Sequence, residues 1–334
     1  MSKNFKKVMI LLCFLFIVAF VLSLSWGTYI MTPSEIFQTL IGNGTKNQNI
    51  TIWSLRLPRI SVAILVGICL STAGCLLQTV TKNDLAEPGM IGINSGSALF
   101  VVLWISYGTT SYYDTLGGFA QYLMPIISII GAFLSWSLVY FLSNKKGVLN
   151  PTRLILTGIG VNIGTNAFIS LYSLTMSRGD FNQVLTWTNG SLWGSTWEYF
   201  YLILPFVIVI MFFVVYKMKV LDVLTLGDEL AIGLGVNVDK ERKVLAVLAV
   251  CLGGIATSVA GNIAFLGLLA PQLAKQLVGP THKKLVPTSA IIGTIIIVFA
   301  DLLSRNLFSP VEIPVGITIS VVGVPYFVYL LMKE

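Results

Sequence analysis

Charged side chains are scarce in this sequence of 334 residues. Asp, Glu, Lys and Arg together make up 10% of it, against 55% hydrophobic residues and a mean hydropathy of +0.86. A soluble domain usually carries about 25% charged residues, so the scarcity of charge excludes a soluble globular protein. At roughly 20 residues per membrane-spanning helix, the length leaves room for about ten spans. The sequence therefore predicts an all-α, polytopic membrane protein.

The sequence also lacks the motifs of common catalytic sites. It contains no G-x-x-x-x-G-K-[ST] phosphate-binding loop and no H-E-x-x-H zinc motif. We therefore expect neither nucleotide hydrolysis nor a membrane-embedded enzyme, and no cofactor. The four cysteines lie within apolar runs without C-x-x-C spacing, which favours reduced packing residues over a disulfide or a metal site: Cys13, Cys69, Cys75 and Cys251.

Ten apolar segments are candidate membrane spans. They lie at residues 8–26, 58–79, 90–107, 119–142, 153–174, 197–216, 243–260, 263–279, 286–304 and 315–332. The first segment has no convincing small-residue cleavage site, so we expect a retained anchor rather than a signal peptide. We treat residues 1–334 as a single transmembrane domain.

The basic residues are unevenly distributed along the chain, which has a formal net charge of +7. When the ten segments alternate from a cytoplasmic N-terminus, all but five of the 21 Lys and Arg residues fall on the inner side. This is the positive-inside rule, and it predicts a multi-pass protein of the cell membrane with both termini in the cytoplasm. The exceptions are Lys46, Arg56, Arg59, Arg178 and Arg305.

Four of these five outer residues are arginines. Their side chains can simply reach toward lipid headgroups. Four together favour a second reading, a docking surface for carboxylates, because a guanidinium group is a planar fork of donors. Asp301 and Arg305 are four residues apart, which also predicts an ion pair within one helix.

One inner loop, at about residues 220–241, contains a short helical pattern. Leu226, Leu230 and Leu234 recur at every fourth position and form one apolar stripe. The acids Asp228 and Glu229 lie near its start, where the helix dipole favours negative charge. A helix of this size can rest on the membrane, but such helices usually have a basic polar face. The acidic face favours a protein partner.

Two predicted spans carry polar side chains at helical spacing. In 58–79, Gln78 extends a face that contains Ser71 and Cys75. In 153–174, four residues form a longer stripe: Asn162, Asn166, Ser170 and Ser173. Such stripes make interhelical hydrogen bonds or line a water-filled path. The length of the second stripe favours a translocation path.

The two halves of the chain are related in topology. The four spans of 58–174 start outside, and the four spans of 243–332 start inside. This is the arrangement of an inverted repeat, which is common in transporters.

Several spaced motifs together resemble a known family, the FecCD-type permeases of ATP-binding-cassette importers of iron–siderophores, haem or cobalamin. The resemblance covers essentially the whole chain. The motifs are Leu55–Arg59, Ala73–Gly74, Asn83–Gly89, Ser95–Gly96, Ala260–Gly261, Phe265–Leu268, Ala300–Arg305 and Glu312–Gly316.

The resemblance implies a ten-helix fold and a set of partners. These are a second permease subunit in a homodimer or heterodimer, two cytosolic ATP-binding subunits, and an extracytoplasmic substrate-binding protein or lipoprotein. It also implies roles for individual positions. Docking of the binding protein is implied for Arg56, Arg59 and Arg305, and gating for Asn83, Leu85, Pro151 and Thr152. Coupling to the ATPase is implied for Leu226, Gly227, Asp228, Glu229, Leu230, Leu234 and Gly235.

The chain departs from the family pattern at one place. The family commonly has Pro-His followed by Arg, where this chain has Pro271–Gln272 followed by Lys275. No role of that histidine transfers to this chain. The only histidine here, His282, lies in a predicted loop beside Lys283, and we interpret it as structural or solvent-facing.

We therefore expect a permease that moves an intact iron–siderophore across the membrane, driven by separate ATPase subunits. A cobalamin or haem importer is the alternative cargo. An ion-coupled secondary transporter is a further alternative, but it usually needs an acid at the bilayer midplane. Asp301 is the only acid near a span interior by sequence, and it lies close to the outer end.

Overall fold

The computed structural model describes residues 2–108, 120–145, 148–149, 151–309 and 311–333. Within these ranges the regular secondary structure is helical, apart from one pair of two-residue antiparallel strands, and loops and turns connect the elements. The elements are α1 (Ser2–Ser25), α2 (Pro33–Leu40), α3 (Lys46–Asn49), the π-helical η1 (Ile50–Arg56), α4 (Leu57–Thr81), the 3-10 turn η2 (Pro88–Ile91), α5 (Ile93–Gly108), α7 (Ala120–Ser143), β1 (Asn144–Lys145), β2 (Val148–Leu149), α8 (Pro151–Ser173), α9 (Arg178–Thr188), α10 (Trp197–Leu224), α11 (Asp228–Gly233), α12 (Val238–Ala260), α13 (Leu266–Val278), α14 (His282–Asn306) and α15 (Val315–Lys333).

Each of the ten predicted apolar segments coincides with a helix, which confirms the all-helical fold. Residue 119, the start of the fourth segment, lies outside the described residues. Seven helical runs are long and apolar enough to cross a membrane: α1, the continuous run Lys46–Thr81, α7, α8, α10, α12 and α14. Helices α5, α13 and α15 are shorter. The number of ten spans therefore stays a prediction.

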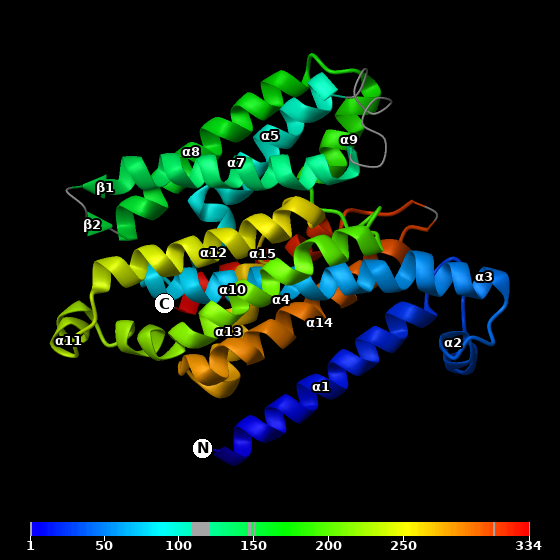
Figure 1. Cartoon of the computed structure of the whole chain (residues 1–334), viewed down its shortest axis with the longest axis horizontal. Coiled ribbons are helices and arrows are strands. Elements are labelled where there is room, and N and C mark those ends of the chain that lie inside the picture. Colours follow the sequence, from blue (N-terminus) through cyan, green and yellow to red (C-terminus); the bar gives the residue numbers. More distant parts are fainter. Residues whose placement is uncertain (1, 109–119, 146–147, 150, 310, 334) are drawn as a thin grey trace.

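Helix α4 forms the centre of the bundle (Figure 1), where it packs against α12, α13 and α14. Of the candidate spans, it is the most buried, and α8 and α10 are the least. Glycines permit this close packing. A Cβ atom on Gly74 would lie 1.8 Å from the Gly267 carbonyl oxygen, and one on Gly67 would lie 2.7 Å from the Cα of Thr294.

The short helices α5 and α13 begin inside the bundle rather than at its end. Pro88, just before α5, lies against both Gly253 of α12 and Gly267 of α13. The amide of Asn94, at the start of α5, donates to Asn262 before α13 at 2.7 Å. The 3-10 turn η2 and Gly92 precede α5, and residues 261–265 precede α13, so both helices are shorter than the spans predicted at 90–107 and 263–279.

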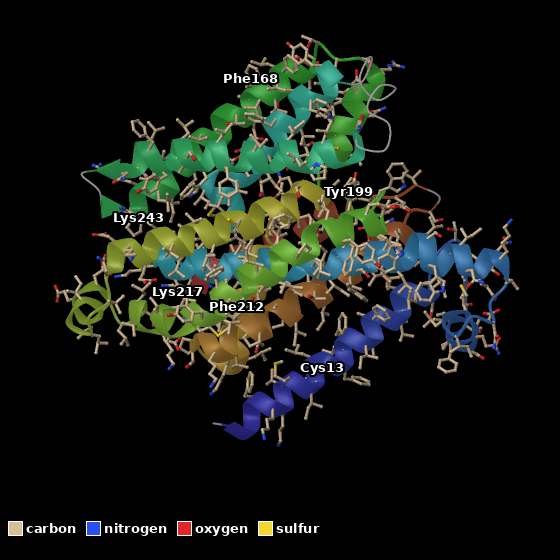
Figure 2. All side chains as sticks on the ribbon, viewed as in Figure 1. Cys13, Phe168, Tyr199, Phe212, Lys217 and Lys243 are labelled. Atoms are coloured by element: carbon tan, nitrogen blue, oxygen red, sulfur yellow. The ribbon has the colours of Figure 1, made fainter. Side chains whose placement is uncertain are left out.

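Different elements lie at the two ends of the bundle. In Figure 1 both chain termini, α11 and the β1–β2 hairpin lie at one end, and α2, α3 and α9 lie at the other. Figure 2 places Lys217 and Lys243 toward the α11 end. We call these the α11 end and the α9 end. Assigning the α11 end to the cytoplasm rests on the distribution of basic residues, as predicted above.

Around the bundle, large apolar side chains face outward. Phe168 of α8 and Phe212 of α10 are exposed in the isolated chain, and Figure 2 labels them on the peripheral helices. A soluble protein rarely exposes so many large hydrophobic residues together. Such a surface suits contact with lipid tails or with neighbouring subunits.

Candidate functional site

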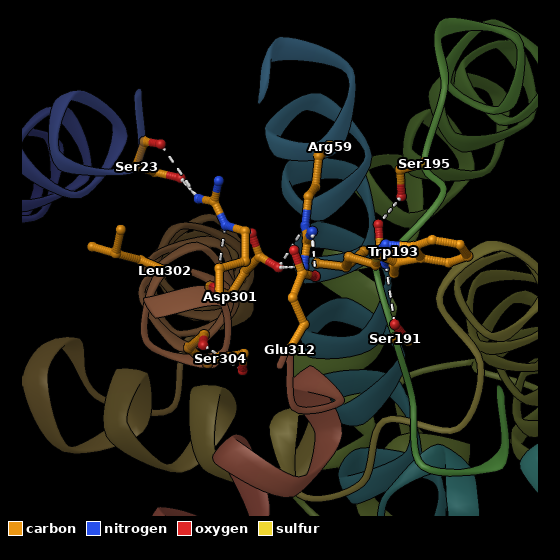
Figure 3. Close-up of polar contacts among 12 residues, drawn as sticks. Ser23, Arg59, Ser191, Trp193, Ser195, Asp301, Leu302, Ser304 and Glu312 are labelled. Carbon is orange, nitrogen blue, oxygen red and sulfur yellow. Dashed lines mark hydrogen bonds and ion pairs between the residues drawn. The ribbon is translucent and has the colours of Figure 1, made fainter. Parts of the chain in front are cut away.

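Two of the four outer arginines, Arg59 and Arg305, form a cluster of ion pairs with two acids (Figure 3). Arg59 contacts Asp301 at 2.8 Å and Glu312 at 2.8 Å, so it bridges α4, α14 and the segment before α15. Arg305 pairs with Asp301 at 3.2 Å, which confirms the predicted pair within one helix, and donates to the Ser23 hydroxyl at 2.7 Å. Asp301 is buried between the two guanidinium groups.

Arg56 is buried and lies apart from these ion pairs. Its guanidinium group donates to the backbone carbonyls of Leu24 and Tyr29, and it lies against Gly27. A side chain on Gly27 would occupy this place, since its Cβ would lie 2.6 Å from the arginine. Arg56 therefore holds the connection after α1 against η1. Of the three predicted docking arginines, Arg59 borders the most exposed partner, because Glu312 is 37% exposed.

The predicted polar stripe on α8 is only partly buried. Asn166 and Ser170 are exposed and Ser173 is buried. Asn166 donates to Asn162 at 2.8 Å, and the two serines bond to carbonyls of their own helix. Asn166 and Ser170 thus have hydrogen-bond partners on α8 itself, and their exposed polar groups suit water or another subunit better than lipid.

Gln78, the other predicted path residue, is buried near the end of α4. Its side-chain nitrogen has no hydrogen-bond partner among the residues that the structure describes. A separate hollow, with a volume of about 590 Å³ and a mostly apolar lining, lies between α9, α15 and the segment before α13. Its polar lining residues were not predicted from the sequence: Thr188, Asn189, Asn262 and Ser320.

At the α11 end, the predicted short helix is present but shorter than the leucine spacing indicated. Helix α11 has six residues, and Gly227 and Gly235, with φ angles of 108° and 83°, flank it. Such angles favour glycine, and they turn the chain sharply on both sides of the helix. The leucines of the stripe, together with one isoleucine, are exposed at 57–63%: Leu226, Leu230, Leu234 and Ile232.

Asp228 fixes this helix to the rest of the chain. Its two carboxylate oxygens accept bonds from Arg242 of α12 at 2.7 and 3.0 Å, and one of them contacts Lys82 at 2.7 Å. Partial burial raises the pKa of Asp228, but the hydrogen bonds and positive charges of Lys82 and Arg242 outweigh this, so its pKa lies below the usual value. The acid is therefore ionised at neutral pH, and its neighbour Glu229 stays exposed.

The structure brings together residues of the two predicted gate regions. Asn83 and Thr152 line one polar hollow of about 520 Å³, together with Lys82, Asp84 and Leu156. Leu85 does not line it, but its N–H donates to the Asn83 side chain at 2.9 Å. Pro151 and Thr152 are the first two residues of α8, so the predicted start of this span at 153 is corrected by two positions.

Two polar contacts of the interior were missed from the sequence. Glu87 lies before α5, and its carboxylate accepts a bond at 2.8 Å from the N–H of Phe265, which begins α13 with a positive φ of 64°. His282 is buried and opens α14, so its predicted placement in a loop was wrong. Its ring contacts Asp222 at 2.7 Å and Thr79 at 2.8 Å, in agreement with the structural interpretation.

Metal ligands are not concentrated anywhere in the described residues, where no group of three or more His, Cys, Asp or Glu side chains could hold an ion. The four cysteines are free.

The fold defines a multi-helix membrane protein, with an ion-pair cluster at one end and exposed apolar side chains on and beside α11 at the other. The sequence matches the FecCD transport family over residues 15–333, so the chain belongs to that family. It is thus a transport permease of the cell membrane rather than a catalytic subunit.

Individual relatives and one solved structure cover nearly the whole chain. The chain is 46% identical to the iron(3+)-hydroxamate import system permease protein FhuG of Bacillus subtilis, over 96% of this chain and 94% of the relative. It is 38% identical to the Fe(3+)-citrate import system permease protein YfmE of Bacillus subtilis, over 97% and 94%. A structure described as an inward-facing conformation of a putative metal-chelate type ABC transporter superposes with a TM-score of 0.85 at 28% identity, over 98% of this chain and 100% of that chain.

Proposed function

We propose that this chain is the permease subunit of an importer that moves an intact iron(III)–siderophore of the hydroxamate class into the cell. The observation that carries the proposal is the 46% identity, over nearly the whole of both chains, to a permease named for iron(3+)-hydroxamate import. Relatives named for Fe(3+)-citrate and achromobactin transport support the broader class of ferric chelates. The exposed part of the α8 stripe carries an amide and a hydroxyl rather than metal ligands, which suits a chelate that stays whole.

Separate ATP-binding subunits supply the energy in this proposal, and they dock on α11. The support is physical. Four large apolar side chains on and beside a six-residue helix are exposed, while Asp228 fixes that helix to α12. Exposed apolar anchors on a rigid element are typical of a protein interface. A second permease subunit, identical or related, covers the exposed polar side of α8.

An extracytoplasmic binding protein docks at the α9 end, with Arg59 as the contact for an acid of that protein. Arg59 already bridges Asp301 and the more exposed Glu312, so a partner carboxylate can replace Glu312. Arg56 and Arg305 hold α1 and the preceding loop in place beneath this surface. The ion-coupled alternative loses support, because Asp301 is occupied by two arginines.

Deleting the chain in its host and measuring uptake of each compound with its own radioactive metal, iron for the ferric chelates and for haem, and cobalt for cobalamin, tests the cargo. We expect loss of uptake of a ferric hydroxamate, with uptake of ferric citrate, haem and cobalamin unchanged, and restoration by the wild-type chain. Loss of haem or cobalamin uptake with normal ferric hydroxamate uptake would overturn the assignment of cargo.

A further inference from the structure

The predicted gate residue Asn83 lies in a tight turn between two charged residues, Lys82 and Asp84. We call Lys82–Leu85 the gate turn. The turn closes on itself, because the Asn83 side chain accepts from the Leu85 N–H at 2.9 Å and the Asn83 carbonyl accepts from the Ala86 N–H at 3.1 Å. A turn bonded in this way tends to move as a unit. The contacts of Lys82 and Asp84, on either side of Asn83, therefore determine the position of Asn83.

Lys82 connects the gate turn to α11. Its ammonium group contacts Asp228 at 2.7 Å, and Asp228 in turn binds Arg242 through both carboxylate oxygens. Arg242 is buried, so its guanidinium position is fixed by α12. Lys82 thus contacts the first residue of the very helix whose leucines are exposed.

Asp84 connects the same turn to α13. Its carboxylate contacts the ammonium group of Lys275 at 2.6 Å, and its backbone carbonyl accepts from the Gln272 side chain at 2.7 Å. Gln272 and Lys275 are three residues apart and so lie on one face of α13. These are the two positions at which the chain departs from the family pattern, and both bind one residue of the gate turn.

The backbone of Lys82 gives a second, independent observation. Lys82 ends α4 in the left-handed conformation with φ of 51°, and it is one of two non-glycine residues with positive φ in the described part of the chain. Glycine adopts this conformation at the end of a helix without the steric cost that a side chain brings. A lysine at this position indicates that its side chain is needed.

We propose that Lys82 and Asp84 are positioning residues that transmit movement of α11 to the gate turn. This inference rests on the proposed function and deepens it. When the ATPase subunits displace α11, Asp228 draws Lys82 with it, while Lys275 and Gln272 keep Asp84 against α13. The turn then rotates between the two anchors and moves Asn83 relative to Thr152, which lines the same hollow.

The ion pairs suit a switch because they are only partly buried. The side chains of Lys82, Asp228, Asp84 and Lys275 are 39–44% exposed. Pairs with this exposure contribute little to folding stability. They can exchange during a transport cycle, and variants that lack them should still fold.

Lys82→Gly in the complete transporter, reconstituted in proteoliposomes with its ATPase subunits and binding protein, tests the proposal. Glycine removes the contact with Asp228 and suits the left-handed backbone, so we expect an unchanged or raised thermal unfolding temperature. We expect ATP hydrolysis to continue while ferric hydroxamate transported per ATP falls about three- to thirty-fold, the range for substitutions along coupling networks. The control variant Lys82→Arg keeps the positive charge, so it should retain most of the wild-type ratio of ferric hydroxamate transported to ATP hydrolysed.

A second pair of variants checks the α13 side. Asp84→Lys should lower transport per ATP, and adding Lys275→Asp should restore it in part by reversing the pair. A wild-type ratio in both Lys82→Gly and Asp84→Lys would overturn the relay. If the wild-type transporter itself shows no ATP-dependent uptake, the proposed function fails instead, so the two failures are distinguishable.

Discussion

At the residue scale, the outer arginines show how a charged residue is retained near a membrane. A guanidinium group has five donors and no acceptor, and here the donors are used within the chain. Arg56 binds two backbone carbonyls, Arg59 bridges two acids, and Arg305 shares one of those acids. Their first role is therefore to hold the outer ends of the helices together, and only Arg59 has a partner that is exposed enough to be exchanged.

Arg59→Gln is the direct test of docking at this residue. We expect affinity for the binding protein to fall about tenfold or more, the cost of removing one partner of a buried charge pair at an interface. Folding should survive, because Asp301 keeps Arg305. Equilibrium binding to the permease in lipid nanodiscs measures this affinity.

Glu312→Gln is the matched control at the same cluster. It removes the competing acid and leaves the Arg59–Asp301 pair, so binding should stay the same or strengthen. Unchanged affinity in Arg59→Gln would contradict docking at this site. Arg56→Glu is a poor test, because it breaks two buried hydrogen bonds and is expected to disturb the fold.

At the element scale, the central helix α4 depends on the absence of side chains. Gly74 and Gly67 place its backbone directly against α13 and α14. This close packing positions the start of α13. Lys275 and Gln272 of α13 in turn bind Asp84, and so they position the gate turn, which follows the C-terminal end of α4.

Gly74→Ala tests how much the stability of the fold depends on the close approach of α4 to α13. The new methyl group meets a backbone oxygen at 1.8 Å, so the helices must separate. We expect destabilisation of about 1–3 kcal/mol or more, as for other overpacked cores, seen as a lower unfolding temperature in detergent. Gly164→Ala is the control, because nothing lies within 4 Å of its new methyl group. Equal unfolding temperatures for the two variants would contradict this account of the packing.

Much of the element pattern could be predicted from hydropathy, because each long apolar run became a helix. The short outer helices were missed although their signals are present. Thr32 with Glu35 and Thr45 with Gln48 form capping boxes that begin α2 and α3. The late starts of α5 at Ile93 and α13 at Leu266, three residues after the predicted starts at 90 and 263, could not be predicted, because they depend on Pro88 packing against Gly253 and Gly267.

The candidate sites, like the helices, could be predicted where the signal is local in the sequence, but not where it depends on tertiary packing. The spacing of Leu226, Leu230 and Leu234 predicted an apolar surface on a short helix, and all three are exposed. The partners of the gate turn could not be found from spacing, since Lys275 lies 191 positions from Asp84 and Asp228 is far from Lys82. Only the packing of α4 against α12 and α13 brings these charges together.

At the scale of the whole molecule, surfaces suited to partners lie at both ends and along one side. The α11 end exposes leucines, the α9 end holds the Arg59–Glu312 pair, and α8 exposes Asn166 and Ser170. On a single chain in lipid, the exposed Asn166 amide and Ser170 hydroxyl of α8 would face hydrocarbon. The arrangement fits a subunit within a transport assembly better than a carrier that works alone.

ATP-dependent uptake of a ferric hydroxamate into proteoliposomes that contain this chain and its partner subunits tests the central claim most directly. We predict accumulation when ATP reaches the ATPase side and none from a proton or sodium gradient alone. Leu230→Asp on α11 should abolish the uptake, whereas a change at the exposed Lys240 outside α11, Lys240→Ser, should not. Accumulation driven by an ion gradient without ATP would contradict the account.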